Sequence, residues 1–336
     1  MTNINEIAKQ MVADGKGILA ADESSGTIKK RFDGINVDSS EENRMNYRRI
    51  LLESKEAMEN YISGVILFDE TIRQSNSAGE KLVDIIKKSG TLPGIKVDMG
   101  AKSLAKMQDE TVTEGLDGLR ERLQEYSELG AKFAKWRAVI SISEKNPSQL
   151  CIDANAHALA RYAALCQESE IVPIVEPEVL MDGSHSIQKC YDVTKKTLLK
   201  VFDNLLLHNV DLKGICLKPN MIIGGSENSQ RSTSKEIAQM TVDCFKECVP
   251  EEVPGIVFLS GGQSEIEATE NLNEINKIEN TPWKLSFSYG RALQSSALKA
   301  WQGKLENEDL CSEAFTHRAK MNSLASKGSW SNQQEG

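Results

Sequence analysis

Residues 132–178 decide the fold, and they read KFAKWRAVISISEKNPSQLCIDANAHALARYAALCQESEIVPIVEPE. An apolar run rich in β-forming residues, Lys132–Ile140, leads into a longer helical pattern, and a second such run follows at Ile171–Glu178. Two strands separated by a helix predict a parallel pair joined by a crossover. Because both runs are apolar almost throughout, we expect both faces of the sheet to be covered.

The same unit recurs along the whole chain. Six further runs start strand–helix units: Gly17–Asp22, Val65–Asp69, Gly94–Asp98, Gly214–Asn220, Gly255–Ser260 and Lys284–Gly290. Eight units favour an α/β fold of the closed (β/α)8 TIM barrel type over an open doubly wound sheet. Ser39 and Thr233, each three residues before a glutamate, are predicted helix N-caps. No linker divides the chain, so we predict one catalytic barrel over residues 1–322 and a flexible C-terminal tail over 323–336.

Composition excludes several classes of protein. The 336 residues are 40% hydrophobic, as in an ordinary globular protein, and the net charge of −9 argues against an extended nucleic-acid surface. No stretch approaches the roughly 18 apolar residues of a membrane span, and the N-terminus does not resemble a signal peptide. Seven scattered cysteines suggest a reducing compartment. We therefore expect a cytoplasmic protein that binds neither nucleic acid nor membrane.

Polar residues gather where the predicted strands end. In a (β/α)8 barrel the active site lies at the carboxyl ends of the strands. The residues expected there are Asp22, Ser24, Thr27, Lys96, Asp98, Lys135, Arg137, Glu176, Glu178, Lys218, Ser260, Ser288 and Arg291. Residues two apart on a strand share a face, so Lys135 with Arg137, and Glu176 with Glu178, are expected to project together into the barrel mouth.

Lysines inside apolar strands indicate chemistry rather than structure. Burying a lysine disfavours its charged form, and Lys218 lies among apolar residues in ICLKPN. A desolvated lysine near another cation becomes a nucleophile toward carbonyl groups, and Lys135 is the candidate second cation. Glu176 and Asp22 are then candidates for moving protons around the resulting imine. For Lys96 alone, a side chain that reaches out to solvent at the strand end is an open alternative.

Two glycine-containing loops suggest phosphate binding. They are Ser260–Gln263 (SGGQ) and Tyr289–Arg291 (YGR), after the seventh and eighth predicted strands. Barrels frequently bind phosphate at these two loops, and the arginine of the second adds a charged fork. The loop Ser24–Thr27 with Lys30 and Arg31 is a candidate second phosphate site, although the two cations could equally form a solvated helix face.

Motifs of metal and cofactor enzymes do not occur in the sequence. No two of the four histidines have the spacing of zinc ligands. There is no Walker A pattern, dinucleotide fingerprint or nucleophile elbow. We therefore expect a lysine-dependent enzyme that uses no metal and no cofactor.

At this level of detail the sequence resembles the class I fructose-bisphosphate aldolases. The collinear matching segments are GKGILAADESSGTIKKRF, GVILFDETIR, GIKVDMG, GLDGL, KFAKWRAVI, IVPIVEPEVL, CLKPNM, VFLSGGQSEIEA and SFSYGRALQSSALKAWQGK. They run from about residue 6 to about residue 327, and LKPNM, FAKWR and VEPE together are highly specific. The resemblance implies a (β/α)8 barrel that cleaves fructose 1,6-bisphosphate into dihydroxyacetone phosphate and glyceraldehyde 3-phosphate.

The resemblance also implies roles for individual residues. Lys218 would be the Schiff-base lysine, Glu176 the acid/base for carbinolamine dehydration with Lys135 in support, and Asp22 the acceptor of the C4 hydroxyl proton. The implied phosphate-binding residues are Ser260, Gly261, Gly290 and Arg291 at one end of the sugar, and Ser24, Thr27, Lys96 and Arg137 are expected around the other end, with Arg31 nearby. Glu178 and Ser288 are further implied substrate-binding residues. The family further implies a homotetramer.

The sequence departs from the family pattern in one feature, and two alternative functions remain open. Many family members end in a tyrosine that assists proton exchange on the enamine, whereas this chain ends SWSNQQEG. A different Schiff-base aldolase or a transaldolase would share the lysine but need only one phosphate site. A barrel that acts mainly as a protein-binding scaffold would not need the catalytic set.

Overall fold

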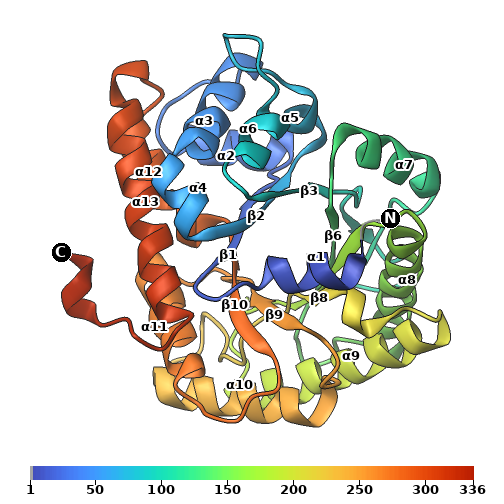
Figure 1. Ribbon diagram of the computed structural model, residues 1–336. Helices are drawn as coiled ribbons and strands as arrows, with labels where there is room; N and C mark the ends of the chain where they lie inside the picture. Colours follow the sequence, from blue (N-terminus) through green and yellow to red (C-terminus); the bar gives the residue numbers. More distant parts are fainter. Residues whose placement is uncertain (1–2) are drawn as a thin grey trace.

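The computed structural model describes residues 3–336 and contains a closed barrel of eight parallel strands (Figure 1). Around the barrel the order is β1-β10-β9-β8-β7-β6-β3-β2. The strands are β1 (Gly17–Ala21), β2 (Ile62–Leu67), β3 (Leu92–Lys96), β6 (Phe133–Ile140), β7 (Val172–Val179), β8 (Cys216–Leu217), β9 (Gly255–Phe258) and β10 (Lys284–Tyr289). The predicted (β/α)8 barrel is confirmed, with each of the eight predicted runs supplying one strand.

Helices surround the barrel and cover its outer face, and α1 lies across one end of the barrel (Figure 1). They are α1 (Ile4–Met11), α2 (Ser25–Asp33), α3 (Glu41–Glu53), α4 (Lys55–Asn60), α5 (Asp69–Arg73), α6 (Leu82–Lys88), α7 (Leu119–Leu129), α8 (Gln149–Glu168), α9 (Ile187–Leu207), α10 (Ser234–Cys248), α11 (Glu265–Asn276), α12 (Arg291–Trp301) and α13 (Glu308–Ala325). Thr233 caps α10 as predicted, whereas α3 is capped by Ser40 rather than Ser39. No helix in the described residues is long and apolar enough to cross a membrane.

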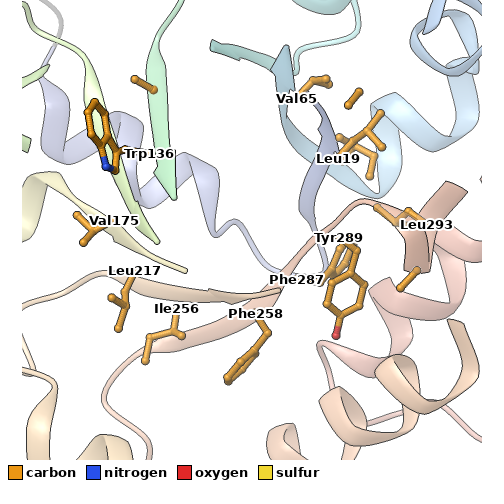
Figure 2. Packing of buried hydrophobic residues seen from close by; sticks show 14 of the residues in the cluster. Leu19, Val65, Trp136, Val175, Leu217, Ile256, Phe258, Phe287, Tyr289 and Leu293 are labelled. Atoms are coloured by element: carbon orange, nitrogen blue, oxygen red, sulfur yellow. The ribbon is translucent and has the colours of Figure 1, made fainter. Parts of the chain in front are cut away.

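Two apolar layers hold the barrel together. Strand side chains such as Leu19, Trp136 and Val175 are fully buried and belong to the layer between strands and helices (Figure 2). Inside the barrel a second cluster includes Ile66 and Val172, and α1 contributes its buried face, including Met11, to it. Each fully buried large aliphatic side chain stabilises the fold by about 1.5–3 kcal/mol. Because α1 and this inner cluster fill one end of the barrel, the polar cavity lies at the other end, where the strands have their carboxyl ends.

An antiparallel hairpin follows β3 and was not predicted. Its strands β4 (Ala101–Ser103) and β5 (Thr111–Thr113) have three residues each, and β4 is fully exposed. Strands of three residues, here with mainly polar side chains, are too short to show an apolar alternation in the sequence.

The C-terminal segment packs against the barrel. Helix α13 continues to Ala325, so the expected domain boundary after residue 322 falls within a helix. Beyond it the indole of Trp330 is buried, and Glu335 forms an ion pair with buried Arg318. The flexibility of residues 323–336 in solution remains a prediction.

Candidate active site

A cavity of about 1040 Å³ lies at the carboxyl ends of the barrel strands, and every residue predicted for the site lines it. These are Asp22, Ser24, Thr27, Arg31, Lys96, Lys135, Arg137, Glu176, Glu178, Lys218, Ser260, Gly261, Ser288, Gly290 and Arg291. The strands therefore bring together residues that lie up to 269 positions apart in the sequence.

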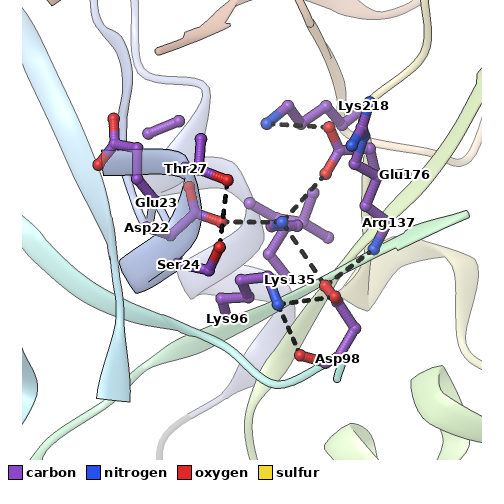
Figure 3. Close-up of polar contacts among 12 residues, drawn as sticks. Asp22, Glu23, Ser24, Thr27, Lys96, Asp98, Lys135, Arg137, Glu176 and Lys218 are labelled. Atoms are coloured by element: carbon purple, nitrogen blue, oxygen red, sulfur yellow. Dashed lines mark hydrogen bonds and ion pairs between the residues drawn. The ribbon is translucent and has the colours of Figure 1, made fainter. Parts of the chain in front are cut away.

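Lys218 projects from the end of β8 into this cavity. Its backbone N–H donates to the Val175 carbonyl at 2.8 Å, so the barrel ladder extends to Lys218 although β8 itself ends one residue earlier. The side chain is 5% exposed, and its Nζ lies 3.2 Å from Oε1 of Glu176 on the neighbouring β7 (Figure 3). The lysine is thus desolvated, held by rigid backbone and beside a carboxyl group that can exchange protons with it.

Lys135 lies at the centre of three carboxylates. Its Nζ is 2.8 Å from Oδ2 of Asp22, 3.6 Å from Oδ2 of Asp98 and 3.6 Å from Oε2 of Glu176 (Figure 3). Burial by itself lowers the pKa of Lys135, but the three carboxylates outweigh it and raise the pKa well above its ordinary value. The three carboxylates therefore favour the charged form of the Lys135 side chain.

The carboxyl group of Asp22 is strongly acidic. Burial by itself raises the pKa of Asp22, but the ammonium groups of Lys135 and Lys218 outweigh burial and lower the pKa to about 2. Asp22 directly follows β1, and its side chain is 13% exposed. It is therefore an ionised acceptor within the cavity at neutral pH.

Two cations predicted as substrate contacts have carboxylate partners. Lys96 Nζ lies 2.7 Å from Oδ1 of Asp98, and its side chain is only 16% exposed. The alternative of a lysine extending into solvent therefore does not hold, because the ammonium is bound inside the cavity. Arg137 forms an ion pair with Glu178 from the adjacent strand, which follows from their neighbouring register in β6 and β7.

The loops after β9 and β10 present polar groups without partners. Gly261 and Gly262 have φ values of 56° and 92°, a conformation that favours glycine, and they lead into α11. The Oγ of Ser288 is buried without a hydrogen-bond partner. Arg291 starts α12, is exposed and forms no ion pair within residues 3–336. These features fit an anion that would accept from backbone N–H groups, a hydroxyl and a guanidinium.

The first βα loop supplies a second polar cluster. Ser24 Oγ and Thr27 Oγ1 lie 3.1 Å apart (Figure 3). Arg31 forms an ion pair with buried Glu23. Its guanidinium also lies close to Gly290, since a β-carbon at that position would be 3.4 Å from Nη2 of Arg31. Arg31 therefore reaches toward the loop after β10, next to the polar groups described above.

Two carboxylates of this region, Asp98 and Glu23, were assigned no role from the sequence. Asp98 ends a predicted strand two residues after Lys96, and this spacing was the signal that could have paired them. The register that places Lys96 opposite Lys135 was not accessible from sequence alone. Among residues 3–336 no cluster of three or more histidine, cysteine or acidic side chains could hold a metal ion.

The fold and this site define a (β/α)8-barrel enzyme whose chemistry rests on buried lysine and carboxylate side chains. A family model described as fructose-bisphosphate aldolase class-I matches residues 3–336. The chain therefore belongs to the class I fructose-bisphosphate aldolase family, and the predicted class, a metal-independent lyase, is confirmed.

Individual relatives agree with this assignment. The chain is 54% identical to a probable fructose-bisphosphate aldolase class 1 of Xanthomonas campestris, over 97% of both chains. It is also 54% identical to fructose-bisphosphate aldolase 4, cytosolic, of Arabidopsis thaliana, over 94% of this chain and 80% of that one. A solved structure of the Plasmodium falciparum aldolase, in complex with TRAP and a small-molecule inhibitor, superimposes with a TM-score of 0.96 at 48% identity and covers 98% of this chain and 95% of that one.

Proposed function

We propose that this class I aldolase cleaves fructose 1,6-bisphosphate reversibly into dihydroxyacetone phosphate and glyceraldehyde 3-phosphate, with Lys218 as the Schiff-base residue. The observation that carries the proposal is the buried row in which Lys218 contacts Glu176 and Lys135 contacts both Glu176 and Asp22. In this row a nucleophile and two groups that can move protons share one desolvated cavity.

The first half of the reaction builds the imine. Lys218 first passes a proton to Glu176, and its neutral amine then attacks the C2 carbonyl to give a carbinolamine. Glu176, whose Oε1 lies 3.2 Å from the lysine nitrogen, delivers a proton to the departing hydroxyl, which leaves as water. Lys135 keeps its charge beside Glu176 and stabilises the carboxylate that this transfer produces.

The second half breaks the C3–C4 bond. Asp22 accepts the proton of the C4 hydroxyl, the C4–O bond becomes a carbonyl, and the electron pair of the C3–C4 bond moves into the imine to form an enamine. Glyceraldehyde 3-phosphate leaves, the enamine is protonated at C3, and hydrolysis of the imine releases dihydroxyacetone phosphate. The low pKa of Asp22 makes it ready as an acceptor before each turnover.

Two phosphate positions select the bisphosphate. One would be bound at Ser260, Gly261, Ser288, Gly290 and Arg291, with Arg31 beside Gly290, and the other end of the sugar would contact Ser24, Thr27, Lys96, Arg137 and Glu178. The test compares cleavage of fructose 1,6-bisphosphate and of fructose 1-phosphate in wild type and Arg137→Met. We expect a tenfold or greater loss with the bisphosphate and a much smaller loss with the monophosphate. Equal losses would favour a monophosphate aldolase or a transaldolase.

We also propose that the protein is a cytoplasmic homotetramer. Helix α9 exposes Leu199, Leu206 and Leu207 on the surface, with 43%, 58% and 78% of each residue accessible. Exposed apolar side chains grouped on one element are typical of an interface. Sedimentation velocity of wild type and Leu206→Asp tests this, with a tetramer expected for wild type and smaller species for the variant.

A further inference from the structure

Asp98 occupies the space between two lysines of the site, and the reaction sequence above gives it no proton to carry. Its side chain is 3% exposed, with Oδ1 2.7 Å from Lys96 Nζ and Oδ2 3.6 Å from Lys135 Nζ (Figure 3). The same two oxygens accept from the backbone N–H groups of Gly100 at 3.1 Å and Arg137 at 3.3 Å. Two backbone N–H groups and the Lys96 ammonium therefore fix this carboxylate in one orientation, with the Lys135 ammonium in ion-pair distance.

The strand register explains why a carboxylate is needed at this point. Lys96 on β3 is the direct parallel partner of Lys135 on β6, so two ammonium groups would face each other in a desolvated cavity. The backbone N–H of Val97 donates to the Lys135 carbonyl at 3.1 Å, which extends the ladder and brings Asp98 alongside both lysines. Like charges this close destabilise each other unless an opposite charge lies between them.

Of the three carboxylates around Lys135, Asp98 is the one that keeps its charge throughout the cycle. Asp22 and Glu176 each gain or lose a proton during the reaction proposed above. In the step in which either is protonated, its attraction for the Lys135 ammonium is lost, and Asp98 remains. Burial raises the pKa of Asp98, but Lys135 and Lys96 outweigh this effect and lower it, so the group stays ionised.

We propose that Asp98 is a positioning residue that holds the Lys135 ammonium between Asp22 and Glu176 through every step of the reaction. This inference rests on the proposed role of Lys135 in imine formation at Lys218. In imine formation Asp98 acts only through Lys135, and it touches no substrate atom.

A double-mutant cycle tests the proposal. The rate at which borohydride traps dihydroxyacetone phosphate on the enzyme is measured in wild type, Asp98→Asn, Lys135→Met and the double variant. Asparagine keeps the shape of the side chain and an acceptor for one backbone N–H but removes the charge. We expect Asp98→Asn to slow trapping at least tenfold in wild type and less than twofold in the Lys135→Met background, since the residue through which it acts is then absent. Asp153→Asn, an ion-paired aspartate on the outer helix α8, is the matched control and should trap at the wild-type rate.

The outcomes separate this inference from the proposed function. Equal slowing by Asp98→Asn in both backgrounds, or no slowing in either, would overturn the role of Asp98 while a wild-type adduct at Lys218 would leave the function intact. Absence of an adduct in wild type would instead overturn the function. If Asp98→Asn does not fold, the same cycle is run with Asp98→Glu, which keeps the charge and displaces it by one methylene. We again expect Asp98→Glu to slow trapping when Lys135 is present and not in the Lys135→Met background. Equal slowing in both backgrounds would again contradict the proposal.

Discussion

Lys135 is the residue around which the charges of the site are arranged. The sequence suggested a cation that would lower the basicity of Lys218, whereas the structure surrounds Lys135 with Asp22, Asp98 and Glu176. With the Lys96–Asp98 and Arg137–Glu178 pairs, four cations face four carboxylates in this part of the cavity. The site is therefore locally balanced although the whole chain carries a net charge of −9. The two carboxylates assigned to proton transfer, Asp22 and Glu176, can therefore take up or release a proton beside the Lys135 ammonium.

The two carboxylates assigned to proton transfer should be separable by reaction step. Asp22→Asn is expected to form the imine and to lose cleavage, because its role comes after the Schiff base. Glu176→Gln is expected to slow imine formation itself. General acid–base assistance is worth roughly 10²–10⁴-fold, so both losses should be large. Borohydride trapping measures the first step and cleavage of fructose 1,6-bisphosphate the second. Equal trapping rates in the two variants would contradict the assignment.

The low pKa of Asp22 has a consequence for stability at acid pH. Its pKa is about 2 in the folded protein against an ordinary value of 3.8, so the charged form stabilises the fold above the unfolded pKa, and this contribution is lost as pH falls through the folded pKa. The shift corresponds to about 2 kcal/mol. The free energy of unfolding in urea is measured at several pH values for wild type and Asp22→Asn. The difference between the two proteins should be constant from pH 7 to about 5 and should decrease in the acid range below about 4. A difference that changes between pH 7 and 5 would mean that Asp22 titrates there and that its pKa is not lowered.

At the scale of elements, the sequence located all eight barrel strands but not their ends. The predicted runs at Gly17–Asp22 and Gly94–Asp98 extend past the observed strands, which end at Ala21 and Lys96. In both cases the predicted run ends on a carboxylate of the cavity, Asp22 or Asp98, with apolar Val97 before Asp98. An apolar pattern indicates burial between the strands and the helices. It therefore continues past the hydrogen-bonded end of a strand, to the point where side chains turn toward the cavity.

The candidate site was predictable because barrel topology assigns every strand's carboxyl end to one place. What the sequence could not supply was which charge contacts which. No role for Asp98 could be predicted, because its partners, Lys96 and Lys135, come together only through the β3–β6 register. The position of Arg31 beside Gly290 likewise depends on the path of α2 and on the ion pair with Glu23.

The C-terminal segment gives a prediction at the same scale. Trp330 is buried, its backbone N–H donates to Asn273 at 2.9 Å, and its indole N–H donates to Glu335 at 2.9 Å. Replacing a buried tryptophan by alanine costs about 3–5 kcal/mol. Trp330→Ala should therefore lower the free energy of unfolding by that order, whereas exposed Gln333→Ala should not.

Catalysis should respond differently from stability to this segment. The tail carries no tyrosine, so deleting residues 329–336 should leave cleavage and proton exchange on dihydroxyacetone phosphate within about threefold at a temperature where the protein is folded, or roughly 0.7 kcal/mol. A hundredfold drop in proton exchange with imine trapping intact would show that the tail takes part in proton transfer. No change in unfolding free energy for Trp330→Ala would show instead that the segment is flexible in solution.

For the whole molecule, the barrel acts as a scaffold that brings eight strand ends to one desolvated cavity, where lysine chemistry takes the place of a Lewis acid. The residues lining it include lysines, arginines, carboxylates and hydroxyls, and the imine withdraws electrons as a metal ion would. Cleavage of fructose 1,6-bisphosphate should accordingly be unchanged after dialysis against EDTA. Loss of activity that zinc restores would contradict the metal-independent mechanism.

Covalent trapping at Lys218 tests the central claim most directly. The full-length protein is incubated with dihydroxyacetone phosphate, reduced with borohydride and digested, and the modified peptide is identified by mass spectrometry. We expect one reduced adduct per chain, on the lysine of CLKPNM, because buried Lys218 has Glu176 as its carboxylate neighbour at 3.2 Å, whereas the ammonium of Lys135 is held by three carboxylates. An adduct on Lys96 or Lys135 instead, or no adduct under conditions in which the protein cleaves its substrate, would contradict it.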